Sequence, residues 1–249
     1  MRHSKNKLPR LDPSLISAEK LVIFDTHPIQ YRSPVFRVLA KKNPKTKVFF
    51  FNESFDGNRW WFHEVGKIPS QKFGLVLDTG FPNSVLGTRG LGPLKLYRML
   101  KGVLTSEKPS AVLIYGYYLP EHWILRRLCA KLAIPILFIG ETFSQGKISV
   151  RWFLKQILAR YYFHGVTEFI AIGNRTVDFY RSWKVSESRI TAAKYCTDVS
   201  FFQLPREQGK ETRTRLRRSF GIPEEAFVVH FVGRLFERKR PLDDLALHE

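Results

Sequence analysis

The stretch AVLIYGYYLPEHWILRRLCAKLAIPILFIG, residues 111–140, decides the fold. Two short apolar runs, at 111–115 and 135–139, enclose a longer segment whose apolar residues recur at helical spacing. Continuously apolar runs are typical of parallel strands that are buried on both faces. The stretch therefore predicts a strand, a helix and a second, parallel strand. The apolar side of this helix includes a cysteine that we interpret as a core residue: Ile124, Leu125, Leu128, Cys129 and Leu132.

The same alternation continues in both directions along the chain. Further apolar runs of strand length lie at 21–24, 47–51, 169–172 and 227–232. Four helix boundaries are predicted around them. Ser33 and Pro34 open one helix as N-cap and first residue, Pro93 opens another, Asn174 caps a third, and Gly221 ends a fourth. Strands that alternate with helices predict a doubly wound α/β structure.

The domain organisation follows from one polar stretch, FQLPREQGKETR at 202–213, which we predict to be a linker. Residues 1–19 form a basic tail, and residues 20–205 contain enough strands and helices for a complete α/β domain. Residues 206–249 contain one helix, one strand and the start of another helix, which is too little to bury a core. We expect them to be the start of a truncated second domain.

The composition limits the classes of partner. The chain has 41 Lys and Arg against 22 Asp and Glu, a formal charge of +19. Such a charge favours polyanions, namely nucleic acid, nucleotide phosphates or an anionic membrane surface. Cys129 and Cys196 have neither disulfide nor zinc-ligand spacing, which suits a reducing cytoplasm. The N-terminus has no apolar signal segment and no apolar run spans a membrane, so we expect any membrane contact to be peripheral.

Candidate site residues follow the predicted strands, because open α/β sheets bind ligands at the carboxyl ends of their strands. Asp25 and Arg32 share a polar loop with three of them, and we expect the strand ends to face one crevice. Simpler interpretations stay open: glycine after a strand is ordinary turn chemistry, His27 could be a polar loop residue and Glu141 a solvated cap. The candidates are His27, Gln30, Tyr31, Gly116, Tyr117, Glu141, Gly173, Asn174, Gly233, Arg234 and Lys239.

The strongest local signal is GRLFERK at 233–239. Gly233 lets the backbone approach a diphosphate, and Arg234 and Lys239 neutralise its charge. The chain has neither the P-loop pattern nor the Gly-x-Gly-x-x-Gly pattern. Neither a nucleoside triphosphatase nor a simple dehydrogenase is therefore supported.

The stretch FVGRLFERKRPLDDLA, 231–246, resembles the opening of the donor-binding domain in GT-B glycosyltransferases of family 4. The resemblance implies that Gly233, Arg234 and Lys239 hold the diphosphate of a nucleotide sugar. Residues 168–202, which end in Asp198 and Phe202, are similar to the family's last N-domain stretch.

Two further stretches, THPIQYRSPVFRVLAK at 26–41 and IGETFSQG at 139–146, are similar to one subset of the family, with Thr142 in place of a serine. The resemblance implies a GT-B fold, with one complete and one incomplete Rossmann-like domain. The family completes its donor site with two glutamates farther along, and this chain ends at Glu249 before such a pair. We therefore expect an incomplete form with little activity alone.

The activity implied by the resemblance is a retaining transfer of a sugar from a nucleoside diphosphate to an acceptor hydroxyl. The N-domain candidates would hold the acceptor, with His27 and Glu141 as catalytic candidates. No metal or cofactor is expected besides the donor, because two cations can stabilise the diphosphate. The charge suits a glycan or lipid-linked acceptor at the inner face of an anionic membrane. The alternatives are a non-catalytic acceptor-binding half and a basic nucleic-acid-binding protein, the latter motivated by charge alone.

Overall fold

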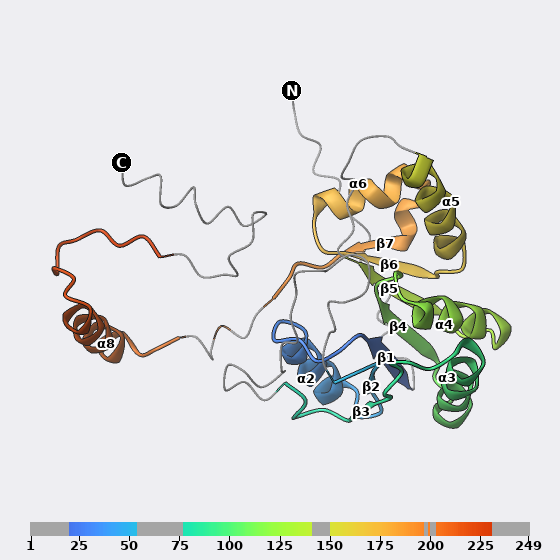
Figure 1. Ribbon diagram of the computed structural model, residues 1–249, viewed down its shortest axis with the longest axis horizontal. Coiled ribbons are helices and arrows are strands. Elements are labelled where there is room, and N and C mark those ends of the chain that lie inside the picture. The colour runs from blue at the N-terminus through green and yellow to red at the C-terminus, as the bar shows by residue number, and fades with distance from the viewer. Residues whose placement is uncertain (1–19, 54–76, 141–149, 197–198, 200–202, 231–249) are drawn as a thin grey trace. The chain divides into compact units, whose positions relative to one another are not determined.

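The computed structural model describes residues 20–53, 77–140, 150–196, 199 and 203–230. The chain divides into two compact units, Met1–Asp198 and Val199–Glu249, and each is described here by itself (Figure 1).

The first unit contains one sheet of seven parallel strands in the order β3-β2-β1-β4-β5-β6-β7 (Figure 1). The five predicted strands of this unit are confirmed as β1, β2, β4, β5 and β6. The sequence did not predict β3 and β7, which have only three residues each. The strands are β1 (Leu21–Asp25), β2 (Lys47–Phe50), β3 (Asn83–Val85), β4 (Ala111–Tyr115), β5 (Ile136–Gly140), β6 (Glu168–Ala171) and β7 (Ile190–Ala192).

Helices cover both faces of this sheet, as the predicted doubly wound class requires. Four of them, α3 to α6, contribute to one apolar cluster, whereas α2 packs on the opposite face through Phe36 and Ala40. Figure 1 shows α2 apart from α3, α4 and α5. The helices are α2 (Ser33–Lys42), α3 (Pro93–Glu107), α4 (Pro120–Lys131), α5 (Val150–His164) and α6 (Asn174–Ser182), followed by a 3-10 turn at Glu187–Arg189.

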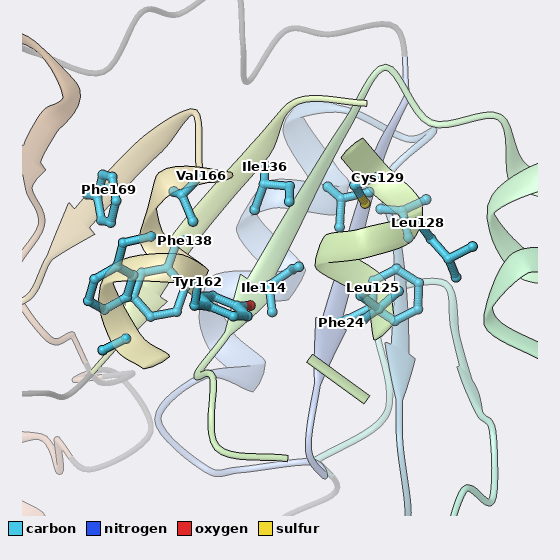
Figure 2. Close-up of a cluster of buried hydrophobic side chains, with 14 of the residues drawn as sticks. Phe24, Ile114, Leu125, Leu128, Cys129, Ile136, Phe138, Tyr162, Val166 and Phe169 are labelled. Carbon is cyan, nitrogen blue, oxygen red and sulfur yellow. The ribbon is translucent and has the colours of Figure 1, made fainter. Parts of the chain in front are cut away.

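The core shows why the inner strands are mostly apolar. Alternate residues of β1 enter different clusters, Phe24 one and Ile23 the other, because successive side chains point to opposite faces. Figure 2 shows the larger cluster, in which Phe24 and Ile114 lie near Leu125 of α4. Cys129 is wholly buried in it, so its predicted core role is confirmed.

Two of the predicted helix starts differ by one residue from the structure. Arg32 occupies the N-cap of α2, because Ser33 is already helical and its hydroxyl donates back to the Ile29 carbonyl at 3.0 Å. Gly173 occupies the N-cap of α6, and Asn174 is the first helical residue. The predicted start at Pro93 is confirmed.

The second unit contains α8 (Arg206–Ser219), which follows Pro205. The predicted linker is therefore wrong from Arg206 onward, since proline suits a helix start and the following residues are mostly good helix formers. The predicted helix end is confirmed, because Gly221 has the left-handed φ of +64°. The predicted strand at 227–232 is wrong over its described residues, 227–230, which pair with no strand in the described part of this unit. A lone strand leaves its backbone groups unpaired.

Among the helices that the structure describes, none combines the length and the apolar character needed to cross a membrane.

Candidate functional site

The candidate site lies where the strand order reverses, between β1 and its neighbour β4 (Figure 1). The chain leaves β1 toward α2 on one face and leaves β4 toward α4 on the other. Ligands of open α/β sheets bind at such a switch point, outside the carboxyl ends of the strands. The structure therefore brings two sets of predicted residues to one edge: His27, Gln30 and Tyr31 after β1, and Gly116 and Tyr117 after β4.

An ion pair fastens the loop between β1 and α2. The Arg32 guanidinium donates to Asp25 Oδ1 at 2.5 Å, and the Asp25 side chain has no exposed surface. The Thr26 amide donates to the same oxygen at 2.7 Å. Burial raises the pKa of Asp25, while the charge of Arg32 and these hydrogen bonds oppose the rise. Arg32 also lies 4.4 Å from the ring centroid of Tyr115, so it links both strand ends.

His27 is half-buried in this loop, next to the ion pair. Its Nδ1 lies 2.9 Å from the Thr26 hydroxyl, which lies 3.4 Å from Asp25 Oδ1. Burial, and secondly the charge of Arg32, lower the pKa of His27 to about 4. The imidazole is therefore neutral near pH 7. A neutral imidazole can exchange a hydrogen bond with a substrate hydroxyl or accept its proton.

The other residues of this loop extend toward the surface. Gln30 is exposed, and Tyr31 is half-buried with its ring edge-on to Tyr195, at 5.3 Å between centroids. Tyr195 follows β7 in the chain and is itself largely exposed. The two tyrosines therefore join the loop after β1 to the end of the first unit.

The turn after β4 depends on a glycine. Gly116 has a φ of +89°, and a Cβ there would lie 3.0 Å from Tyr118 Cε1 and 3.6 Å from His122 Cε1. His122 is wholly buried in the first turn of α4, where its Nδ1 accepts from the Leu119 amide at 3.0 Å. Burial, with a smaller effect of the Arg32 charge, lowers the pKa of His122 to about 3, although the Tyr115 backbone opposes this. His122 thus fixes the start of α4 as a neutral ring.

Tyr117 lies in an aromatic environment. Its ring centroid is 5.4 Å from Phe163, 5.9 Å from Tyr162 and 6.1 Å from Phe138. The side chain is half-buried, so the ring packs on α5 and β5 while part of it stays accessible.

The sequence did not predict a second polar network at this edge. The Thr88 hydroxyl donates to Glu121 Oε1 at 2.8 Å and accepts from Asn52 Nδ2 at 3.3 Å. The backbone N–H of Asn52 donates to the Thr26 carbonyl at 3.1 Å. Glu121 is buried in the first turn of α4, and its Oε2 has no hydrogen-bond partner among the described residues. An acidic residue after the Gly116 turn was a visible signal. Nothing in the sequence pointed to Asn52 or Thr88.

The remaining predicted residues lie elsewhere. Gly173 and Asn174 are exposed at the start of α6, after β6, which is three strands from β1 or about 14 Å at ordinary strand spacing. The structure does not bring them to His27. Outside the described residues lie Glu141, Asp198, Phe202, Gly233, Arg234 and Lys239. In the described ranges, no group of three or more His, Cys, Asp or Glu side chains is placed to hold a metal ion.

Comparison with known proteins identifies the fold. No protein-family model matches the chain, and no curated protein sequence does either. The HepE protein of Anabaena, solved with UDP and glucose, has 13% identity and a TM-score of 0.51, with 79% of this chain and 50% of that chain covered. The UDP-GlcNAc 2-epimerase of Neisseria meningitidis, bound to UDP-GlcNAc, has 15% identity and a TM-score of 0.51, with 81% and 53% covered.

These similarities confirm the predicted fold class, a Rossmann-like parallel sheet of the GT-B type. The chain spans about half the length of the solved structures that it matches. Membership of glycosyltransferase family 4 stays a prediction.

Proposed function

We propose that this chain forms the acceptor-side part of a GT-B glycosyltransferase, which transfers a sugar from a nucleoside-diphosphate sugar to an acceptor hydroxyl. The observation that supports this most directly is the neutral His27 at the carboxyl end of β1, beside a buried ion pair. Structures of the same fold hold UDP, UDP-glucose or UDP-GlcNAc. A fixed, neutral imidazole suits a sugar hydroxyl, because it can orient the oxygen and accept its proton.

The neighbours of His27 would set its tautomer. If the Thr26 hydroxyl donates its hydrogen bond to Asp25, the Thr26 oxygen can accept a hydrogen bond from Nδ1–H of His27. The Nε2 atom of His27 is then unprotonated and can accept a hydrogen bond or a proton from the substrate. Arg32 would keep Asp25 charged and the loop closed. The acceptor-side candidates at the same edge, Gln30, Tyr31, Gly116 and Tyr117, would line the remaining path of the acceptor. Glu141 would be the alternative catalytic group.

Donor binding rests on the sequence. Gly233, Arg234 and Lys239 would hold the diphosphate, and the two cations would stabilise the charge that builds on the leaving group. No metal or further cofactor is then needed, and we propose retention of the anomeric configuration. The acceptor would be a glycan or lipid-linked glycan, met at the cytoplasmic face of an anionic membrane.

The test is a transfer assay with a panel of nucleoside-diphosphate sugars and hydroxyl acceptors, with products identified by mass spectrometry and their anomeric configuration by NMR. Because this chain is expected to have little activity alone, the assay uses a protein in which a complete donor-binding domain follows it. In that protein, His27→Gln should lower kcat/KM about 100-fold. The matched control is His164→Gln, at an exposed position of α5, which should leave kcat/KM unchanged. Glycan binding without transfer would favour a non-catalytic acceptor-binding half. Binding of neither nucleotide sugar nor glycan would contradict the proposal.

A further inference from the structure

The outer surface of α5 exposes three apolar side chains. Ile157, Leu158 and Tyr161 are 52%, 55% and 60% exposed, and their spacing places them on one side of the helix. Their neighbours Ala159, Tyr162 and Phe163 are buried in the core, so the helix has apolar residues on both sides. Single exposed apolar residues are common, but a cluster of them on a monomer marks an interaction site.

Tyr161 is held in a surface aromatic pair. Its ring stacks on Trp123 of α4, with centroids 6.4 Å apart and planes 8° from parallel. The Arg126 guanidinium carbon lies 4.2 Å from the Tyr161 centroid, and Arg126 Nε donates to the Tyr162 carbonyl at 3.0 Å. Tyrosine and tryptophan prefer surroundings in which one end is apolar and the other wet, as at the boundary of a bilayer.

The charge around this pair has one sign. Helices α3, α4 and α5 each contain three Lys or Arg residues, and together they contain two glutamates. Glu107, the last residue of α3, is paired with Lys20 and Lys47, and Glu121 is buried. Arg127, one turn along α4 from Trp123, and Arg160, next to Tyr161 in α5, are both exposed. No exposed carboxylate of these three helices, where the structure describes them, opposes an anionic partner.

We propose that the surface formed by Trp123, Arg127, Ile157, Leu158, Arg160 and Tyr161 docks on a bilayer that contains anionic lipid. The arginines meet the headgroups while Ile157 and Leu158 enter the boundary with the acyl chains. Nucleic acid would match the charge but would gain nothing from two aliphatic side chains, and the Tyr161 ring already stacks on Trp123 and Arg126. This docking rests on the proposed function and specifies which surface of the chain would meet the membrane. It is measured without donor or acceptor, so the two proposals can fail separately.

The test is flotation of the full chain with vesicles of phosphatidylcholine alone and of phosphatidylcholine with phosphatidylglycerol. The chain should float only with the anionic vesicles, and less so as salt is raised. Leu158→Asp should weaken binding about tenfold, since its burial in the bilayer is worth on the order of 1.5 kcal/mol. Arg160→Glu should weaken it by a similar factor. The matched controls are Val38→Asp and Lys41→Glu on α2, which are exposed on the opposite side of the sheet and should bind as the wild type.

Three results would overturn the docking surface. The first is equal flotation with neutral and anionic vesicles. The second is wild-type binding by Leu158→Asp, which is expected to fold because the position is exposed. The third is tighter binding to polyuridylate than to anionic vesicles at the same salt concentration, because nucleic acid would then be the partner.

Discussion

Arg32 lies seven positions after Asp25 and places its guanidinium 2.5 Å from the Asp25 carboxylate, at the end of the interior strand β1. Removal of the arginine leaves a buried carboxylate without a counter-ion. Arg32→Leu should therefore lower the free energy of unfolding by about 3 kcal/mol, measured by urea denaturation near neutral pH. The loss should shrink in acid, because a protonated Asp25 needs no counter-ion. The double variant Asp25→Asn/Arg32→Leu should recover part of the stability; if it is no more stable than Arg32→Leu, the pair is not the cause.

His27 should make the chain sensitive to mild acid. Its folded-state pKa of about 4 lies below the ordinary 6.5. Between these pH values His27 is protonated in the unfolded chain and neutral in the folded chain. Stability should fall as the pH drops from 6.5 toward 4, and His27→Gln should make this fall shallower. Thermal unfolding across that range measures it, with His164→Gln as the control that keeps the full slope. An unchanged slope in His27→Gln would show that His27 protonates freely in the folded state.

Glu107 should stabilise the amino end of the sheet, where it pairs with Lys20 at 2.7 Å and Lys47 at 2.8 Å. Burial tends to raise its pKa, but the hydrogen bonds and charges of the two lysines outweigh this and lower it from 4.5. The stabilisation is present above 4.5 and is lost as the pH falls through the lowered pKa. Glu107→Gln should cost about 1 kcal/mol at neutral pH and close to nothing in strong acid, as shown by urea midpoints. Glu53→Gln, at an exposed position of the same unit, should cost little at either pH.

The two described glycines among the site candidates should respond differently to alanine. Gly116 has a positive φ and a crowded Cβ position, so Gly116→Ala should cost about 1 to 2 kcal/mol of unfolding free energy. Gly173 has an extended backbone with φ of −178° and an open Cβ position, so Gly173→Ala should stay within about 0.5 kcal/mol of the wild type. Equal effects in chemical denaturation would contradict the strained turn after β4.

The two cysteines should differ in reactivity. Cys129 is buried, and burial raises the pKa of its thiol to about 12, whereas Cys196 is exposed. N-ethylmaleimide should therefore label Cys196 in the native chain and both cysteines in urea, because only the thiolate reacts. Intact-mass spectrometry distinguishes one adduct from two. Native labelling at Cys129 would mean that the core around α4 opens readily.

Sequence periodicity was enough to predict the fold. The runs that became β1, β2, β4, β5 and β6 are buried over most of their length, so most of their residues are apolar. The edge strands β3 and β7 escaped prediction because an edge needs less burial, and Asn83 and Ser84 of β3 are only half-buried. The run at 227–230 shows the converse, since apolar composition produces no strand without a neighbour to pair with.

The site was predictable only in part. The rule that ligands meet the carboxyl ends of strands predicted the loops of His27 and Gly116. It could not predict which side chains contact one another. The hydrogen bond from Thr88 to Glu121 joins residues 33 positions apart, and it depends on the register of β2 with β3 and on the rotation of α4. Charge alone, likewise, did not locate the surface around Tyr161.

The register of β1 on β4 has a consequence for synthesis on the ribosome. Leu21 pairs with Ala111, so β1 leaves the exit tunnel long before β4, the neighbour that closes one of its edges. Until residues 111–115 emerge, the nascent chain exposes the edge of β1 that faces away from β2, an unpaired edge of the kind from which aggregation starts. Because closing so long a loop is slow, this unit should fold late and depend on chaperones during translation.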